Sequence, residues 1–406
     1  MIGQLNLNAF IGEVTGRGHS MFLPDIEANR QVLRERIKGS RVLAIGSAGT
    51  IGASFVKALL PFEPAKVVVV DTSENGLTEL VRDLRSTDGL PLPPELITYP
   101  VSFADPVFGR LFGAHGPFDI VANFAAHKHV RSEKDIFSIE AMLENNVFRA
   151  RDLLERLTHT PPRHFFCVST DKAANPVNIM GASKKIMEDL IMAYRDLLPV
   201  TTARFANVAF SNGSLPQGFL ERLMKGQPLS APLDVRRYFV SPEESGQICM
   251  LACMLGRSGD IFFPRLSEDV DVRRFSDIAC DLLKTLGLEA EQHDSEASAR
   301  RAAAAFRPGD RKYPVYFFTS DTTGEKPVEE FVAEGEVADF DEFAALGVIH
   351  TRPGRTRQEI EGLITQVRGY LAAGGEVTKE GVVQRLDKYL GGFAHQETGK
   401  NLDHRM

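Results

Sequence analysis

Hydrophobic and polar positions follow two alternating patterns along the first half of the chain. Short apolar runs bounded by turn residues, typical of buried strands, alternate with stretches in which apolar residues recur at helical spacing. This βαβα order predicts an α/β fold with a Rossmann-type doubly wound parallel sheet and right-handed crossovers. The expected strands lie near 41–45, 66–70, 97–101, 118–123 and 164–168, and the expected helices near 52–60, 76–85, 106–112 and 139–157.

The flanking segments follow weaker patterns. The N-terminal arm has an irregular start and then a helix from about Pro24 to Lys38, and the tail carries helical patterns at 360–371 and 377–390. These tail helices are expected to pack on the body or on another subunit. The stretch 294–305, rich in Ala, Ser and charge, predicts a mobile surface helix or loop.

Together these patterns predict four regions. Gly and Pro clusters beyond about Ala206 are typical of a lobe that closes over a substrate. The expected regions are an arm at 1–40, a Rossmann domain at 41–205, a smaller mixed α/β substrate lobe at 206–320 with some chain returning to the core, and a helical extension at 321–406.

Composition and charge narrow the class of protein. The 406 residues are 43% hydrophobic and 25% charged, as in ordinary globular proteins, and the net charge of -7 offers no general attraction to nucleic acid or anionic lipid. No apolar run is long enough to span a bilayer, and no signal-peptide core is present. The four cysteines follow no disulfide or zinc spacing. We therefore expect a cytoplasmic protein without a membrane span or a nucleic-acid partner.

A glycine triad indicates a dinucleotide site. Gly46, Gly49 and Gly52 lie between an expected strand and an expected helix, where glycine lets the backbone approach a pyrophosphate at a helix N-terminus. Asp71 ends the next strand, where a carboxylate accepts hydrogen bonds from ribose hydroxyls and repels a 2′-phosphate, so NAD is favoured over NADP. The alternative role for Asp71 is a helix N-cap. The candidate cofactor contacts are Gly46, Ala48, Gly49, Thr50, Ile51, Gly52, Asp71, Ala125 and Ala126.

The most informative stretch is VSTDKAANPVNIMGASK at 168–184. It places a hydroxyl (Ser169 or Thr170) beside Asp171 and Lys172, at the carboxyl end of a buried strand, where open α/β sheets bind ligands. Adjacent acid and base groups in a cleft are what an elimination with proton transfer requires. The structural alternative is a capped loop with a surface Asp–Lys pair.

The segment after the expected strand 118–123 carries small residues and two histidines. His127 and His129 have no third imidazole or carboxylate at ligand spacing, so we expect no metal here. Lys128 is instead a candidate contact for a sugar or its phosphates. Asn146, inside the next helix, is expected to hydrogen-bond backbone and hold the strand end in place.

Several short motifs resemble one superfamily, the extended short-chain dehydrogenase/reductases. Within it, the chain resembles the nucleotide-sugar 4,6-dehydratases of bacterial polysaccharide biosynthesis that act on UDP-N-acetylglucosamine. The resemblance spans about residues 41–313. The motifs are Asp71–Glu74, Ala125–Val130, Ser169–Pro176, Met180–Lys184, Arg204–Val208, Arg237–Phe239 and Arg307–Gly309.

This resemblance implies a mechanism. In such enzymes NAD+ oxidises C4 to a ketone, a base removes the acidified C5 proton, the C6 hydroxyl leaves as water, and the hydride returns to C6. It also implies that Asp171 is the acid, Lys172 the C5 base and Thr170 a hydrogen-bond partner of O4. Lys184 would hold the nicotinamide ribose, and Ser73 joins the implied cofactor contacts.

One position departs from the superfamily pattern Tyr-x-x-x-Lys. Met180 occupies the tyrosine position, and a thioether cannot accept the alcohol proton. A subgroup of the dehydratases looks the same, so the departure is compatible with activity. It leaves open whether Thr170 through a relay, Asp171 or a water takes the O4 proton.

The resemblance also implies substrate contacts on the second lobe. Arg237 and Arg307 would bind pyrophosphate or nucleotide ribose through charge-assisted hydrogen bonds. Whether Arg236 or Arg237 points inward stays open, and Asp310 stands where relatives have glutamate. The full set of implied substrate contacts is Lys128, His129, Asn207, Ser211, Arg237 and Arg307.

The leading hypothesis is a UDP-N-acetylglucosamine 4,6-dehydratase, expected to be a homo-oligomer. The same reaction on GDP-N-acetylglucosamine is an alternative, because nothing in the sequence indicates which nucleotide base the protein binds. A nucleotide-sugar 4-epimerase has no use for an Asp171–Lys172 pair, and a regulatory protein that only binds NAD and sugar nucleotide needs no proton-transfer residues.

Overall fold

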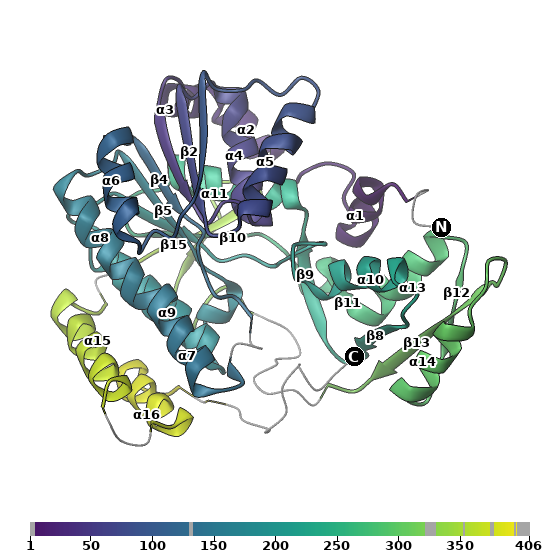
Figure 1. Cartoon of the computed structure of the whole chain (residues 1–406). Coiled ribbons are helices and arrows are strands. Elements are labelled where there is room, and N and C mark those ends of the chain that lie inside the picture. The colour runs from purple at the N-terminus through teal and green to yellow at the C-terminus, as the bar shows by residue number, and fades with distance from the viewer. Residues whose placement is uncertain are drawn as a thin grey trace.

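The computed structural model describes residues 5–129, 133–320, 330–351, 354–373, 377–393 and 395. Figure 1 shows a larger part, built around one sheet with helices on both faces, and a smaller lobe beside it that also holds the N-terminal helix α1. Within the described residues, no helix is both long enough and apolar enough to cross a bilayer.

The central sheet has nine strands in the order β14-β15-β10-β6-β5-β4-β1-β2-β3. Strands β3 to β10 in this order pair in parallel, and β15 and β14 add an antiparallel edge. The predicted doubly wound parallel sheet is therefore confirmed. The strands are β1 Arg41–Ile45, β2 Lys66–Asp71, β3 Glu95–Pro100, β4 Ile120–Asn123, β5 His164–Val168, β6 Val200–Ala203, β10 Asp260–Pro264, β14 Ala338–Asp339 and β15 Leu346–His350.

Both faces of this sheet are covered by helices, so its central strands β1, β4 and β5 are buried along almost their whole length. Strand β2 has the sequence KVVVVD and is likewise buried from Lys66 to Val70. On one face lie α2 Leu23–Ala28, α3 Arg30–Ile37, α4 Thr50–Leu59, η2 Leu60–Phe62, α5 Glu74–Ser86 and α11 Pro242–Leu255. On the other lie α6 Pro106–His115, α7 Ile136–Leu143, α8 Arg149–His159, α9 Ile179–Met192, α15 Arg357–Leu371 and α16 Lys379–Leu390.

The smaller lobe has its own core around two three-stranded sheets, β11-β9-β7 and β12-β13-β8. Its strands are β7 Asn207–Val208, β8 Leu229–Pro232, β9 Arg236–Val240, β11 Val272–Arg274, β12 Glu289–Gln292 and β13 Lys312–Phe318. Its helices are α1 Leu7–Thr15, α10 Leu215–Met224, α12 Glu268–Asp271, α13 Phe275–Thr285 and α14 Glu296–Ala305, the last starting at a Ser295 capping box.

The N-terminal arm differs from the sequence prediction in two ways. Its start is not irregular: α1 is capped by Asn6 and ends at Gly16 with φ of 70°, and Phe10 packs against Phe210 of the smaller lobe. The single helix expected near 24–38 is two helices, because the backbone breaks at Asn29. The arm therefore contacts both parts of the molecule.

The structure also shows where the tail helices pack and how the helix expected near 139–157 is divided. Helices α15 and α16 pack on the body, with Ile364 and Leu386 buried in the same core as α9. The expected helix 139–157 is α7 and α8 joined by one π-helical turn, Glu144–Phe148. Such turns occur frequently at functional sites, and this one carries Asn146.

Candidate active site

The glycine loop joins β1 to α4 along a backbone path that requires glycine at two positions. Gly46 has φ of 72°, and a Cβ there would lie 2.4 Å from the Ala125 backbone nitrogen. A Cβ on Gly52 would lie 2.5 Å from the Ser47 Cα. Gly49 differs, because a Cβ there would meet no protein atom nearer than 3.8 Å in the described structure, so packing does not explain this glycine.

Asp71 holds the glycine loop from the end of β2. Its carboxylate accepts hydrogen bonds from the Ala48 backbone N–H at 2.9 Å and from the Ser73 N–H at 2.9 Å. The N-cap of α5 is Ser73, whose hydroxyl accepts from the Gly76 N–H, so the N-cap alternative for Asp71 does not apply. Asp71 is half-buried, and each carboxylate oxygen has capacity for a further hydrogen bond.

Asn146 fixes the segment that follows β4. Its side chain accepts from the His127 N–H at 2.9 Å and donates to the His127 carbonyl at 3.0 Å and to the Ser183 hydroxyl at 3.0 Å. This is the backbone role expected for Asn146. It connects the Ala125–His127 segment, which lies against Gly46, to helix α9.

The acid, the base and the hydroxyl singled out in the sequence lie together at the carboxyl end of β5. One oxygen of the Asp171 carboxylate accepts from the Thr170 hydroxyl at 2.7 Å and contacts the Lys172 Nζ at 3.2 Å. The Asp171 side chain is 3% exposed and that of Lys172 is 20% exposed. This is a shielded pair with limited solvent access, which does not fit the alternative of a surface Asp–Lys pair.

Helix α9 packs directly against this turn. A Cβ on Gly181 would lie 2.6 Å from the Lys172 carbonyl oxygen, so only glycine allows the approach. Lys184, on the next turn, is buried and donates to the Val168 carbonyl at 2.9 Å. Burial lowers the pKa of Lys184 below its ordinary value. Met180 is also buried, in the core beneath α9.

A buried ion-pair network that the sequence reasoning missed supports the same turn. Arg204, which is fully buried, donates to Glu188 through two bonds of 2.9 and 2.7 Å and to Glu336 through bonds of 2.6 and 2.9 Å. The Ser169 hydroxyl donates to Glu188 at 2.6 Å. Burial alone would raise the pKa of Glu188, but the guanidinium of Arg204 outweighs it and lowers that pKa.

The turn at 211–213 brings the smaller lobe to the glycine loop. The Asn212 N–H donates to the Thr50 hydroxyl at 3.0 Å, and Lys128 Nζ donates to the Asn212 carbonyl at 3.1 Å. The ring of His129 lies against Gly213, whose added Cβ would be 3.1 Å from Nε2. Partial desolvation lowers the pKa of Lys128. Ser211 is buried beside this turn.

The remaining candidate residues on the smaller lobe divide into two groups. Asn207 lies in β7, and its buried Nδ2 has no hydrogen-bond partner among the described residues. Arg237 of the neighbouring strand β9 points inward and is 5% exposed, whereas Arg236 points outward and pairs with Glu268 at 2.5 Å. Arg307 is exposed and donates to carbonyls of its own loop, so the structure does not bring it to the site.

Val130, the last residue of one motif, lies outside the described residues. Ile51 packs at the edge of the core under the glycine loop, and Ala126 lies beside the segment held by Asn146. Glu133 is a further residue that the sequence analysis did not single out. Its carboxylate accepts from the Met180 N–H at 2.9 Å and so helps to fix the start of α9.

Solved structures share this architecture. The structure of Pen from Bacillus thuringiensis matches with a TM-score of 0.63 at 21% identity and covers 79% of this chain and 90% of that one. DesIV, a dTDP-glucose 4,6-dehydratase from Streptomyces venezuelae with NAD and TYD bound, matches with a TM-score of 0.54 at 20% identity, covering 82% and 97%. The chain therefore shares the fold of these two proteins, a large parallel sheet with helices on both faces and a smaller lobe beside it.

Sequence comparison places the chain in a family. Residues 42–336 match the family described as polysaccharide biosynthesis protein, so the chain belongs to that family. The probable polysaccharide biosynthesis protein EpsC of Bacillus subtilis is 28% identical over 284 residues, which are 69% of this chain and 45% of EpsC. The capsular polysaccharide biosynthesis protein CapD of Staphylococcus aureus is 25% identical over 292 residues, 71% of this chain and 47% of CapD. The chain thus spans about half the length of these two relatives.

A third relative has a named reaction. The UDP-N-acetylglucosamine 4,6-dehydratase (inverting) of Campylobacter jejuni is 23% identical over 248 residues, covering 56% of this chain and 67% of that enzyme.

Proposed function

We propose that this protein catalyses the NAD-dependent 4,6-dehydration of a nucleotide-activated N-acetylhexosamine, converting UDP-N-acetylglucosamine to a UDP-4-keto-6-deoxy sugar. The observation that carries the proposal is the shielded Asp171–Lys172 pair, with 3.2 Å between carboxylate and amine, at the carboxyl end of β5. Family membership and the similarity to the Campylobacter jejuni dehydratase support it.

The glycine loop fits a dinucleotide. Gly49 leaves open space at the N-terminus of α4, and the buried Ser47 hydroxyl has no hydrogen-bond partner among the described residues. Asp71 can accept from the adenosine ribose hydroxyls while it holds the loop, which favours NAD over NADP. When bound, NAD+ supplies reversible two-electron chemistry: oxidation of the sugar at C4 and later reduction at C6.

Thr170 is proposed to start the proton transfers. Its hydroxyl already donates to Asp171 at 2.7 Å, so it can accept the O4 proton while passing its own proton to that carboxylate. Met180 cannot take this role, because a buried thioether is no base. Neutralising Asp171 removes the negative partner of Lys172, which favours release of the ammonium proton to solvent.

Lys172 and Asp171 then carry out the elimination. The neutral amine of Lys172 takes the C5 proton, made acidic by the C4 ketone, and the Asp171 carboxyl gives its proton to the departing C6 hydroxyl, which leaves as water. Lys172 returns a proton to C5 when C6 is reduced. The carboxylate is restored, and Lys172 regains its proton from solvent through its partly exposed side chain.

The turn at 211–213 is the proposed phosphate site. Lys128 and the backbone around Asn212 lie beside Thr50, at the N-terminal end of α4 that also favours anions. Arg237 and the Asn207 Nδ2 are proposed to bind the nucleotide part, since both lie buried in neighbouring strands and Nδ2 has no hydrogen-bond partner among the described residues. Arg307 is proposed as a contact only after a movement of its loop, because its guanidinium now bonds the carbonyls of Ala304 and Phe306.

The reaction is tested with purified protein and UDP-N-acetylglucosamine, followed by mass spectrometry and NMR. Dehydration lowers the product mass by one water and converts the C6 methylene to a methyl group. A product of unchanged mass with inverted C4 would show an epimerase, and absence of turnover would show a binding protein. A parallel reaction with GDP-N-acetylglucosamine identifies the preferred nucleotide.

Two glycine substitutions should separate packing from cofactor binding. Gly46→Ala places a Cβ 2.4 Å from Ala125 in a left-handed backbone, which should cost at least about 2 kcal/mol of stability and abolish NAD retention. Gly49→Ala should preserve the melting temperature of the NAD-free protein yet weaken NAD binding. The measurements are thermal melts and bound NAD per chain.

Gly362→Ala is the matched control, because a Cβ on this glycine of α15 meets no atom within 4 Å. Equal NAD binding by the Gly49→Ala and Gly362→Ala variants would contradict the proposed pyrophosphate contact.

A further inference from the structure

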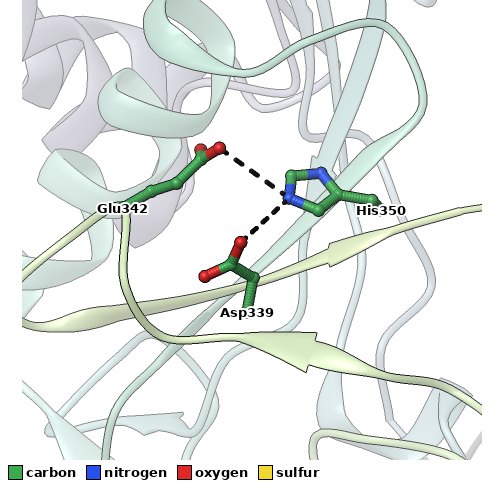
Figure 2. Close-up of side chains that lie close together, drawn as sticks. All are labelled: Asp339, Glu342 and His350. Carbon is green, nitrogen blue, oxygen red and sulfur yellow. Dashed lines mark ion pairs between the residues drawn. The ribbon is translucent and has the colours of Figure 1, made fainter.

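Three side chains of the kind that bind metal ions converge on the antiparallel edge of the central sheet. They are Asp339, Glu342 and His350, from the β14–β15 hairpin, and their ligand atoms all lie within 4.8 Å of one another (Figure 2). His350 Nε2 lies 3.6 Å from Asp339 Oδ2 and 3.9 Å from Glu342 Oε1. Figure 2 shows the imidazole and both carboxylates pointing toward one another.

This cluster is separate from the proposed active site. His350 pairs in register with Asp260, the first residue of β10, whereas Asp171 and Lys172 follow the last residue of the parallel strand β5. In parallel strands, all first residues lie at one end of the strands and all last residues lie at the other end. The cluster therefore needs an explanation other than the dehydration chemistry.

A buried carboxylate from another element orients the histidine. Asp260 Oδ1 lies 2.7 Å from His350 Nδ1, and the Asp260 side chain is 5% exposed. Its other oxygen accepts from the Arg257 N–H at 2.8 Å, so its position is fixed. With Nδ1 donating to Asp260, Nε2 presents its lone pair toward Asp339 and Glu342. Metal-binding histidines are typically held by a carboxylate in this way.

The distances suit a small divalent ion. Two ligand atoms bound tetrahedrally at metal distances of about 2.1 Å lie about 3.4 Å apart. The separations of 3.6 and 3.9 Å from His350 Nε2 require only small side-chain rotations to reach that value. The three side chains are partly exposed, so they can rotate and solvent can complete the coordination.

The charges also leave room for a divalent cation. Asp260, Asp339 and Glu342 surround His350, which is neutral when it binds a metal ion, and Arg257 pairs with Glu342. Three negative charges and one positive charge leave an excess of two. The Arg257 side chain is 72% exposed, and exposed ion pairs are weak. A metal ion can therefore replace Arg257 as the partner of Glu342.

We propose that Asp339, Glu342 and His350 bind one divalent transition-metal ion, with Asp260 orienting the histidine. One imidazole nitrogen with two carboxylate oxygens suits Zn²⁺ better than Mg²⁺ or Ca²⁺, which prefer oxygen ligands. All three ligands belong to the hairpin, and their orienting partner belongs to β10. The ion therefore ties the antiparallel edge of the sheet to its parallel part and has a structural role.

The competing explanation is a proton on Nε2. The hydrogen bond with Asp260 raises the pKa of His350 despite opposing desolvation, so a protonated imidazolium could pair with the same carboxylates. This state would make the cluster an ion-pair network without metal. Titration with zinc at mildly alkaline pH, where the proton is the weaker competitor, distinguishes the two.

The test is calorimetric titration of tag-free, chelator-treated protein with ZnCl2, repeated with MgCl2. We expect one saturable zinc site per chain, no saturable magnesium binding, and a zinc-dependent rise in melting temperature. Asp339→Asn combined with Glu342→Gln should weaken zinc binding at least about tenfold and remove the rise in melting temperature. Both positions are partly exposed, so the variant should fold.

Glu291→Gln is the matched control, because Glu291 also lies beside a histidine, 3.7 Å from His293 in the smaller lobe. It should bind zinc like the unaltered protein. A protein that shows no saturable zinc site, or a double variant that binds zinc as tightly as the Glu291→Gln control, would overturn the proposal. Neither outcome depends on the proposed dehydratase activity.

Discussion

Lys172→Ala should lose at least about a hundredfold in turnover of UDP-N-acetylglucosamine while still binding NAD. General base catalysis by a positioned side chain typically contributes about 10²- to 10⁴-fold, and the structure offers Lys172 as the amine beside Asp171. The loss should fall on kcat, because the amine acts on the C5 proton and the phosphate contacts lie on other elements. Steady-state kinetics and bound NAD per chain provide the measurements.

Lys38→Ala is the matched control for this change. Its side chain is 55% exposed and pairs with Glu63 at 2.7 Å. Lys38 ends α3 just before β1, at the end of that strand opposite to the glycine loop. Turnover of the control should equal that of the unaltered protein. If Lys172→Ala retains the activity of Lys38→Ala, Lys172 is not the base.

Arg204→Met should destabilise the protein more than any other single substitution considered. Arg204 is fully buried between Glu188 and Glu336, and breaking a buried ion pair from one side typically costs about 3–5 kcal/mol. Burial opposes its charge, yet the two carboxylates raise the pKa of Arg204, so it remains a cation throughout the accessible pH range. Its loss strands the Glu188 carboxylate in the core, and the thermal midpoint should fall by many degrees.

Two further variants make this result specific. Arg236→Met removes an exposed pair with Glu268 and should cost no more than about 1 kcal/mol. Adding Glu188→Leu to Arg204→Met removes the stranded charge and should recover much of the loss. A destabilisation by Arg204→Met that matches that of Arg236→Met would show that the network contributes little.

The strands β1 to β5 of the central sheet could be predicted from sequence, because most of them are buried on both faces, whereas β6, β10, β14 and β15 were not among the expected strands. Segments such as Val67–Val70 are continuous apolar runs, and apolar residues in the helices between them recur at helical spacing. The glycine loop and the acid–base turn follow directly from this order, since ligand sites lie at the carboxyl ends of parallel strands. These features depend on local sequence and on a simple topological rule.

Features that depend on tertiary contacts were not accessible in the same way. Helix α1 is an exception, because Asn6 at its N-cap and Gly16 after its last turn are local signals. The pairing of Arg204 with Glu336, 132 residues away, has no local signal. Neither does the approach of Asp260 to His350, which requires the antiparallel register of β10 and β15.

Three arginines show most clearly that sequence alone does not decide which way a side chain points. Adjacent residues in a strand point to opposite faces, so either Arg236 or Arg237 was expected to point inward, and only the pairing of β9 with β7 and β11 decides for Arg237. Arg307 has the same residue type and a motif around it, yet its loop lies on the surface. A motif identifies the residue type at a position, but the tertiary structure around that position determines which groups the side chain contacts.

The central claim is that Asp171 and Lys172 exchange protons with the sugar during elimination. The most direct measurement is turnover of UDP-N-acetylglucosamine in heavy water, with NMR of the product. Because the partly exposed Lys172 exchanges its proton with solvent, the account predicts deuterium at C5 of a product that has lost one water. A dehydrated product with protium at C5, or a product that keeps its water, would contradict it.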